Sequence, residues 1–494
     1  MAEKVISSPL ESGIFKKVVS HAKEYGFVFP SSEIYDGLQA VYDYGQNGVE
    51  LKNNIKNLWW KCMTQLHENI VGIDAAIFMH PTTWVASGHV DGFSDPMIDN
   101  KDSKKRYRAD VLVEERAAEY EAKGDKARGD ALVKNLARLL EANDLKGVQE
   151  LIIAEKIVCP VSGTANWTEV RQFNLMFSTQ VGSVAEDAST IYLRPETAQG
   201  IFVNFLNVQK TGRMKIPFGI AQIGKAFRNE IVARQFTFRM REFEQMEMQF
   251  FIRPGEELKW YQEWKETRMK WHKAMGLPES KLRFHDHEKL AHYANAAVDI
   301  EFEFPFGFKE IEGIHSRTDF DLSSHEKYSK KKQQYFDNEI SKNYVPYVVE
   351  TSVGADRVFL AILCNAYTEE ITGEGEEKKE RIYLKLPPAL APVKAAILPL
   401  VKKDGLAEKG RAIFDDLKYD FKLIYEERDS IGKRYTRQDL IGTPFCIVVD
   451  YQTMEDDTVT IRYRDSMEQE RLPVKAIREK IEKEVSFKTV FEKL

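Results

Sequence analysis

The chain is poor in cysteine, in uninterrupted apolar sequence and in excess charge of either sign. Its 494 residues include four cysteines, at positions 62, 159, 364 and 446, which lie far apart and form no CxxC pair. This spacing argues against a disulfide framework and against a structural zinc knuckle, and it suits a reducing cytoplasm. No run of about 18 apolar residues is present, so we expect no membrane span. The opening stretch MAEKVISSPLESG also lacks the apolar centre of a secretory signal.

The charge balance excludes a polycation that binds nucleic acid through bulk charge. Lysine and arginine number 71 against 77 aspartate and glutamate residues, a net charge of −6. Any nucleic-acid site must therefore be a local patch. Apolar residues make up 43% and charged residues 30%, which is typical of a globular protein rather than a disordered one.

The length of the chain and the changes in its composition from one stretch to the next predict several domains. Residues 100–158 are charged and favour helix, which indicates a helical insertion into a larger body spanning residues 1–385. Two further charged helices are expected near 256–275 and 325–343. An acidic loop at 369–383 is followed by the proline cluster LPPALAP, a plausible linker. Beyond it, strands and helices alternate through residues 390–494, which predicts a small α/β domain whose last 104 residues carry no net charge.

Two neighbouring strands are predicted to present one polar face. In the segment 218–230, Gln222, Gly224, Arg228 and Glu230 alternate onto one side. In RMREFEQMEMQFF (239–251), one face carries arginine, phenylalanine, glutamine and glutamate, and the other carries Met246, Met248 and Phe250. An arginine binds phosphate and an aromatic ring stacks on a base, so this pair favours a nucleotide site over an ordinary amphipathic hairpin.

A third segment, YVPYVVETSVGADRVFLAILCNAY (344–367), predicts a strand that turns at a glycine into an apolar helix. Glu350 and Ser352 alternate on the strand, and Arg357 falls in the first turn of the helix. The helix dipole disfavours a basic residue there unless an anion is bound. The segment therefore indicates an anion site, with an exposed arginine as the alternative.

Together these segments resemble the signature motifs of a known enzyme family. FRNE (227–230) followed by RMREF (239–243) resembles motif 2 of class II aminoacyl-tRNA synthetases, and GADR (354–357) resembles their motif 3. YDYGQNGVELKNNIKNLWW (42–60) is similar to motif 1 of the homodimeric glycyl-tRNA synthetases. RPETAQGIFVNF (194–205) and EIEGIHSRTDFDL (310–322) resemble further signatures of that family. The resemblance runs from about residue 8 to about residue 487, in family order.

The resemblance implies a fold and an activity. The fold is α+β, with an antiparallel catalytic sheet flanked by helices, the helical insertion and a C-terminal α/β anticodon-binding domain. The activity is activation of glycine with ATP to glycyl-adenylate and pyrophosphate, and then transfer of glycyl to the 3′ end of tRNA(Gly). A cytoplasmic homodimer with no membrane partner is implied. The stripe of Ile55, Leu58, Trp59 and Cys62 in motif 1 is the expected dimer element, unless it packs only within its own subunit.

The resemblance also assigns residues to ATP and Mg²⁺. Arg228 is expected at the α-phosphate, Arg357 on the adenine and the distal phosphates, and Glu310 at Mg²⁺; these three form the implied catalytic set. The other implied ATP contacts are Asn229, Glu230, Phe238, Arg239, Arg241, Phe243, Ile311, Gly354, Ala355 and Asp356.

For glycine, the resemblance implies an acidic pocket that holds the ammonium group. Its members are Glu196, Glu247, Glu350 and Ser352, with one of Arg106 and Arg108 also reaching the amino acid. The implied set further contains Phe243, Glu244, Gln245, Met246, Thr351, Val353 and Gly354. No structural zinc is expected at Cys159, and His285, His287 and His315 are expected to form no ligand set.

For tRNA, the best local patch is in SIGKRYTRQDL. Lys433, Arg434 and Arg437 surround Tyr435 there, and an aromatic among basic residues can stack on an unpaired base. A solvated helix face is the alternative interpretation of this segment.

The sequence leaves two other functions open. One is a sister class II ligase for serine, threonine or proline. The other is a non-catalytic RNA-binding paralogue. The ETAQG and ETSVG segments argue against the first, and retention of Arg228, Glu230, Glu310 and Arg357 argues against the second.

Overall fold

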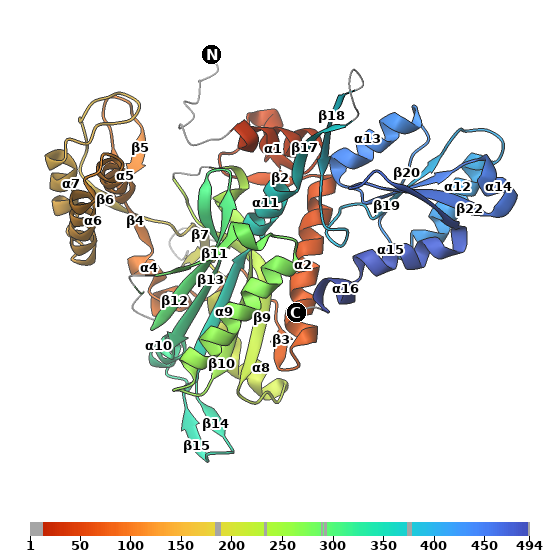
Figure 1. Ribbon diagram of the computed structural model, residues 1–494. Helices are drawn as coiled ribbons and strands as arrows, with labels where there is room; N and C mark the ends of the chain where they lie inside the picture. Colours follow the sequence, from red (N-terminus) through yellow and green to blue (C-terminus); the bar gives the residue numbers. More distant parts are fainter. Residues whose placement is uncertain are drawn as a thin grey trace.

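The computed structural model describes residues 13–182, 189–231, 235–287, 290, 294–372 and 378–492. A seven-stranded sheet occupies its centre, in the order β11-β12-β13-β16-β10-β9-β3 (Figure 1). The strands are β3 (Ile70–Gly72), β9 (Phe218–Phe227), β10 (Glu242–Ile252), β11 (Leu282–Asp286), β12 (Ala296–Phe304), β13 (Gly307–Thr318) and β16 (Tyr347–Gly354). Every neighbouring pair is antiparallel except β3 with β9. The predicted antiparallel pairing of the two motif-2 strands is confirmed.

Three helices cover one face of this sheet. They are α2 (Gln46–Leu66), α9 (Glu257–Ala274) and α11 (Ala355–Ala366), and they share one apolar core with the sheet. Met246, Met248 and Phe250 of β10 project into that core, as the alternation in the sequence predicts. Burial of this continuous apolar surface is the main force that holds the sheet against the helices.

The opposite face is apolar at one end and polar in the middle. Helix α8 (Ala198–Thr211) packs Phe202 and Phe205 against Phe251 of β10, and α10 (Phe320–Ser329) adds Leu322 to the same cluster. The middle of β10 presents Gln245, Glu247 and Gln249 on this face, so it is not covered by apolar side chains.

The amino-terminal elements lead into a small helical module. They are α1 (Gly13–Glu24), β1 (Val28–Pro30), η1 (Glu33–Tyr35), β2 (Tyr42–Tyr44), α3 (Pro81–Ala86) and α4 (His89–Gly92). The module contains β4 (Ser94–Asp99), β5 (Arg106–Arg108), α5 (Ala109–Ala122), α6 (Lys126–Glu141), α7 (Leu145–Ala154) and β6 (Arg171–Asn174). It lies to one side of the sheet (Figure 1) and has its own apolar core, which extends past the predicted 100–158 segment to Trp167 and Val170. Hairpin β7 (Ser178–Val181) with β8 (Ser189–Tyr192) then leads back to α8.

The C-terminal α/β domain forms the other flank (Figure 1). Its sheet has the order β20-β19-β21-β22-β23. The elements are β19 (Ala395–Pro399), α12 (Leu406–Leu417), β20 (Leu423–Tyr425), α13 (Ile431–Ile441), β21 (Phe445–Val449), α14 (Tyr451–Asp456), β22 (Thr458–Tyr463), β23 (Gln469–Pro473) and α15 (Ile477–Val485). The strands and helices predicted for this region are confirmed, while α14 and β23 were not foreseen.

The last helix leaves this domain and returns to the catalytic body. Helix α16 (Phe487–Phe491) places Phe491 in the large core beneath the central sheet, and Phe487 packs beside it. Figure 1 shows the C-terminus close to α2 rather than at the outer end of the C-terminal domain. The expected domain boundary at residues 385–390 assigns α16 to the C-terminal domain. Its apolar face is instead buried by the catalytic body.

Two further expectations change. The helix expected over 325–343 ends at Ser329, where Lys330 adopts a left-handed φ of 60°, and β14 (Tyr335–Asp337) pairs with β15 (Lys342–Tyr344). The predicted acidic loop is a hairpin of β17 (Tyr367–Thr372) and β18 (Lys379–Leu384); its tip at 373–377 lies outside the described residues, as do residues 1–12. Among the described helices, none is long and apolar enough to cross a membrane.

The apolar stripe of motif 1 is buried within its own chain. Ile55 and Trp59 are fully buried, Leu58 and Cys62 nearly so, and all four belong to the core under the sheet. Intrachain packing therefore accounts for the stripe, and the expected homodimer needs a different surface.

Candidate active site

A cavity of about 220 Å³ opens on the polar face of the central sheet. Strands β10, β13 and β16 supply most of its lining because their alternate side chains point to the same face. The lining includes Glu196, Arg228, Glu230, Phe238, Arg239, Phe243, Gln245, Glu247, Glu310, His315, Arg317, Glu350, Ser352, Gly354 and Arg357. The structure thus brings together residues that are far apart in the sequence but come from the predicted motifs.

Two arginines face the cavity. The Arg228 guanidinium lies between the rings of Phe93 and Phe243, at 5.3 and 5.2 Å from their centroids, and its Nε donates to the Pro195 carbonyl at 3.1 Å. Burial lowers the pKa of Arg228. Within the part of the chain that the structure describes, no carboxylate forms an ion pair with Arg228, so its charge is left to attract an anion.

Arg357 lies at the start of α11, as predicted. Its guanidinium is 4.6 Å from the centroid of the Phe238 ring, and Nη1 lies 2.9 Å from a carboxylate oxygen of Glu310. Burial opposes ionisation of Glu310, but the adjacent Arg357 holds the pKa of this carboxyl below its usual value. Glu310 therefore presents an ionised carboxylate at the edge of the cavity.

Glu230 and Arg239 lie at the same edge as a pair. Arg239 Nη1 is 3.6 Å from Glu230 Oε2, and Glu230 is nearly buried. Arg241 donates from Nε to the Glu230 carbonyl at 2.9 Å, which ties the loop between the two motif-2 strands to β10.

Glu350 and Glu196 form an ionised acidic pocket in the cavity. Arg317 lies 3.0 Å from Glu350, and His89 lies 3.4 Å from Glu196. Burial alone would raise the pKa of both carboxyls. The Arg317 charge instead holds the pKa of Glu350 far below its usual value, and His89 and Arg317 lower the pKa of Glu196 to about 2.

Glu247 differs from its two neighbours. It is 2% exposed, accepts a hydrogen bond from the Thr197 hydroxyl and lies beside Gln249, whose amide donates to both Glu247 and Glu350. Burial and the negative charges of Glu350 and Glu196 raise the pKa of Glu247 well above its usual value. Burial and charge therefore favour the ionised forms of Glu196 and Glu350 and the protonated form of Glu247, a balance that a nearby ammonium group would shift.

Several residues of this pocket have no role in the sequence prediction. Arg317 and His315 fall within the quoted segment 310–322, and Thr197 and Gln199 fall within 194–205, but no local pattern distinguishes them. Arg317 also forms a buried ion pair with Asp321 at 2.8 Å, and Gln199 donates to Asp321 at 2.9 Å. Their importance comes from tertiary neighbours, which alternation along one strand does not reveal.

Some predicted contacts have side chains on the wrong face. Met246, Thr351, Val353, Ile311 and Ala355 are buried, and all but Thr351 belong to the apolar core on the helical side of the sheet. The resemblance assigned whole segments, whereas alternation sends every second side chain of a strand away from the cavity. These side chains do not reach the cavity.

Glu244 and Asp356 border the cavity but direct their carboxylates toward α2. Lys52 lies 2.6 Å from Asp356 and 3.0 Å from Glu244, and Lys56 lies 3.0 Å from Glu244. The Glu244 backbone N–H donates to Asp356 at 2.7 Å. Both acids therefore fix motif 1 to motifs 2 and 3, and direct contact of their carboxylates with substrate is not supported.

Neither Arg106 nor Arg108 lines the cavity. Arg108 is engaged by Asp110 at 2.6 Å and Asp95 at 3.3 Å, and Arg106 pairs with Asp99 at 2.7 Å. Arg106 instead lines a separate cavity of about 610 Å³, together with the predicted ATP contacts Asn229 and Arg241. The expectation that one of these two arginines reaches the amino acid is not met in this conformation.

The tRNA patch predicted on α13 does not form as expected. Arg434 is 1% exposed and donates to the carbonyls of Pro399, Glu426 and Leu400. Tyr435 is half-buried under Arg462, at 4.6 Å from the guanidinium to the ring centroid. Arg437 pairs with Glu426 and Asp429, which leaves Lys433 as the exposed cation of the four.

Cys159 and the histidines lie in different surroundings. Cys159 accepts or donates hydrogen bonds with Ser103 at 3.3 Å and Tyr107 at 3.1 Å. Burial opposes ionisation of this thiol, yet the surrounding hydroxyls lower its pKa to about 6. The histidines were expected to form no ligand set, and the structure brings His287 and His315 together with Asp299, with donor atoms within 4.8 Å of one another.

The fold and this cavity define a class II tRNA synthetase. Three family profiles match the chain: tRNA synthetase class II core domain (G, H, P, S and T) over residues 179–366, glycyl-tRNA synthetase insertion domain 1 over 95–129 and 125–175, and anticodon binding domain over 394–484. Synthetases of this class use ATP and Mg²⁺.

Curated relatives narrow the class to one family. The chain is 56% identical over 458 residues to the glycine–tRNA ligase of Chlorobaculum tepidum, which covers 92% of this chain and 97% of the relative. It is 53% identical to that of Staphylococcus saprophyticus over 95% of this chain and 98% of the relative. For the ligase of Treponema denticola the identity is 50%, with 95% and 97% covered. The chain therefore belongs to the glycine–tRNA ligase family.

Proposed function

We propose that this chain activates glycine with ATP and then transfers the glycyl group to the 3′ end of tRNA(Gly). The observation that carries this proposal is the polarity of one cavity. Arg228 and Arg357 follow the ends of β9 and β16, Glu247 and Glu350 line the cavity further along β10 and β16, and Glu196 lies near both groups. A cavity with arginines at the strand ends and carboxyl groups further along suits a triphosphate and a small ammonium compound held side by side.

The first step is an in-line displacement at phosphorus. A glycine carboxylate oxygen forms a bond to the α-phosphorus of ATP, the bond from that phosphorus to the bridging oxygen breaks, and pyrophosphate leaves with the electron pair. No side chain needs to become covalently attached, so positioning and charge stabilisation supply the catalysis. Arg228 and Arg357 stabilise the charge that builds up on the phosphoryl oxygens, and Phe243 offers a ring face for the adenine.

Glu310 fits the Mg²⁺ of this family. It is an ionised carboxylate, its side chain is 45% exposed, and it lies on the rim of the cavity beside Arg357. Mg²⁺ typically binds one or two carboxylates together with substrate phosphates and waters, so one carboxylate beside the triphosphate end is a suitable donor set. The ion would neutralise phosphate charge there.

The acidic pocket supports selection of glycine. The carboxylates of Glu350 and Glu196 attract the ammonium group, and the surrounding Arg317, Thr197 and Gln249 fill the space beyond them. A larger amino acid would have to displace this buried network. Loss of its hydrogen bonds would leave polar groups unpaired, which is the kind of cost that rejects a wrong substrate strongly.

A homodimer belongs to the same proposal. Large apolar side chains are concentrated in the segment that precedes motif 1, where Ile34 is 87%, Tyr35 79% and Leu38 57% exposed. We place the contact with a second copy on this segment, since the motif-1 stripe itself is buried within the chain. The segment continues to Gln39 and Ala40, whose carbonyl groups bind Arg241 of motif 2. Dimerisation would then support the ATP end of the cavity.

The test is amino-acid-dependent exchange of pyrophosphate into ATP, measured with each of the twenty amino acids. Exchange with glycine alone, followed by charging of tRNA(Gly), is the expected result. Exchange with serine, threonine or proline in place of glycine would identify a sister ligase. No exchange with any amino acid would contradict the enzymatic proposal and favour an RNA-binding accessory protein.

A further inference from the structure

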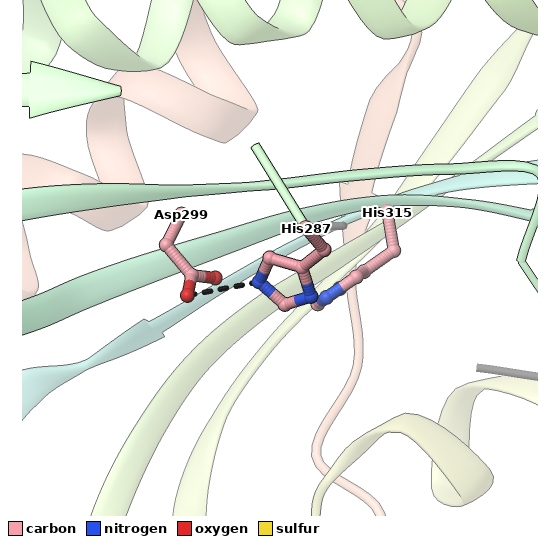
Figure 2. A group of neighbouring side chains, drawn as sticks. All are labelled: His287, Asp299 and His315. Atoms are coloured by element: carbon pink, nitrogen blue, oxygen red, sulfur yellow. Dashed lines mark ion pairs between the residues drawn. The ribbon is translucent and has the colours of Figure 1, made fainter. Parts of the chain in front are cut away.

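Two histidines and one aspartate lie close together beside the cavity, and the proposed reaction assigns no role to them. Of the three, His315 lines the cavity. His287 follows β11, Asp299 lies on β12 and His315 lies on β13 (Figure 2). The strand register places Ala297 opposite His315 and Asp299 opposite Gly313. The backbone N–H of His287 donates to the Ala297 carbonyl at 3.1 Å. All three side chains therefore lie on the same face of the sheet, although their positions, from 287 to 315, span 28 residues of the sequence.

Their donor atoms are close enough to share one ion. One ligand atom from each residue lies within 4.8 Å of the other two, and His287 Nε2 is 2.9 Å from Asp299 Oδ2. In Figure 2 the three side chains point toward one another, with the His287 ring beside both partners. Tetrahedral zinc with ligands at 2.0–2.2 Å brings ligand atoms to about 3.3–3.5 Å from each other, so a small side-chain movement suffices. The side chains are 32%, 16% and 20% exposed, which leaves access for an ion.

A glycine and a carboxylate shape this arrangement around His315. A Cβ atom built on Gly313 would lie 2.8 Å from His315 Cε1. The His315 ring therefore occupies space that the side chain of any other residue at position 313 would need. On its other side, His315 Nδ1 lies 3.0 Å from Glu350 Oε1. A histidine held through one nitrogen by a carboxylate presents its other nitrogen as a ligand, the common arrangement in metal sites.

The local charge favours a cation at this place. Two carboxylates lie beside the histidines, with Asp299 2.9 Å from His287 and Glu350 3.0 Å from His315. We propose that His287, Asp299 and His315 bind one divalent transition-metal ion of the zinc class. Imidazole ligands suit zinc, cobalt and nickel, whereas Mg²⁺ and Ca²⁺ prefer sites made only of oxygen. With three protein ligands, a fourth position stays open to water.

Such an ion would connect this cluster to the acidic pocket. A metal on His315 Nε2 requires the ring proton to stay on Nδ1, from which it is donated to Glu350. The cluster would then fix the orientation of one carboxylate of the ammonium pocket. This consequence rests on the proposed function, whereas binding of the ion does not.

The test is titration of the chelator-treated full-length chain with Co²⁺ alone, in the absence of ATP, glycine and tRNA. Bound metal is measured by equilibrium dialysis with elemental analysis, and the coordination by visible absorption of Co²⁺. We expect His287→Gln and Asp299→Asn each to remove one bound ion per chain or to weaken its binding by at least about 10-fold. Thermal unfolding followed by circular dichroism serves as the check on folding of both variants.

The matched control is His285→Gln, an exposed histidine two residues away on β11. It should bind Co²⁺ as the unmodified chain does. Equal Co²⁺ binding by the His287→Gln and unmodified chains would overturn the proposal, as would displacement of Co²⁺ by equimolar Mg²⁺. Because no substrate is present, such a failure would leave the glycine-activation proposal untouched.

Discussion

At the scale of single residues, three chemically identical carboxyl groups in one pocket have pKa values shifted in opposite directions. Glu196 and Glu350 are held ionised by His89, His315 and Arg317, while Glu247 has its charge opposed by burial and by its two neighbours. Like charges that share a buried site cannot all ionise unless enough cations are present. The difference is therefore set by which cation each carboxyl meets, and it makes the pocket responsive to one added positive charge.

Glycine binding is expected to release a proton from Glu247. The raised pKa of Glu247 favours its protonated form, whereas the ammonium group of bound glycine favours its ionised form. Glycine affinity should therefore rise with pH through the pKa of Glu247 in the free enzyme. Calorimetry in two buffers of different ionisation enthalpy measures the proton. The Glu247→Gln variant should lose the buffer dependence, and equal binding enthalpies in both buffers for the unmodified chain would contradict the prediction.

Arg228 and Arg357 should each be needed for adenylation. Replacement of either by alanine removes one preorganised cation from the phosphate end and should lower ATP–pyrophosphate exchange by about 10²–10³-fold. Arg283→Ala is the matched control, because Arg283 is half-exposed on β11 and pairs with Glu301 outside the cavity. Exchange at the unmodified rate in the Arg228 or Arg357 variant, with an unchanged melting temperature, would exclude these roles.

At the scale of elements, helix α2 is held to the sheet by close backbone approach as well as by charge. Lys52 and Lys56 both reach Glu244 near the start of β10, and Lys52 also reaches Asp356 in the first turn of α11; these pairs are largely buried. Gly48 allows the first turn of the helix to lie directly on the Phe27 carbonyl, because a Cβ there would be 1.8 Å from that oxygen. The position of motif 1 thus depends on a missing side chain.

Gly48→Ala is expected to destabilise the catalytic body despite the better helix propensity of alanine. The clash requires the helix or the Phe27 backbone to shift, at a cost of at least about 1–3 kcal/mol in the free energy of unfolding. Thermal unfolding followed by circular dichroism measures the effect. Gly432→Ala is the control, since that helical glycine has open space around its Cβ position and should gain about 0.5–1 kcal/mol. Equal stability of the two variants would show that the close approach is not limiting.

At the scale of the whole molecule, the C-terminal domain is more firmly attached than a linker suggests. Its last helix buries Phe491 in the catalytic core, and Arg464 donates to the Leu386 carbonyl at 2.7 Å across the junction. Arg381 of β18 also pairs with Asp439 of α13 at 3.0 Å. Deleting the domain would therefore expose part of the catalytic core, and point substitutions are the better probes of its role.

The dimer prediction is tested on the exposed segment before motif 1. Light scattering at micromolar concentration should give twice the chain mass of 57.0 kDa. Aspartate at both Ile34 and Tyr35 should shift the mass to that of a monomer, because it places two charges in an apolar contact. The control is Ile371→Asp, which alters a 71% exposed isoleucine on β17. A monomeric unmodified chain, or a dimeric double variant, would contradict the prediction.

The sequence by itself determined which segments matter and much of their local structure. Alternation in residues 218–227 and 242–252 identified the paired strands and the face that carries Phe243 and Glu247, because a strand repeats every two residues whatever surrounds it. The three signature motifs likewise carried enough local pattern to place Arg228 and Arg357 at one cavity. These are properties of short stretches of chain.

Only the tertiary structure decided which of those side chains are free to act. The sequence predicted Arg434 as a surface cation, but the residue is buried against carbonyl groups. It predicted Glu244 in the glycine pocket, but this carboxylate pairs with Lys52 of α2. His287, Asp299 and His315 showed no ligand spacing along the chain, yet the register of three strands places them together. Burial, protonation and ligand geometry depend on neighbours distant in sequence, so no local pattern contains them.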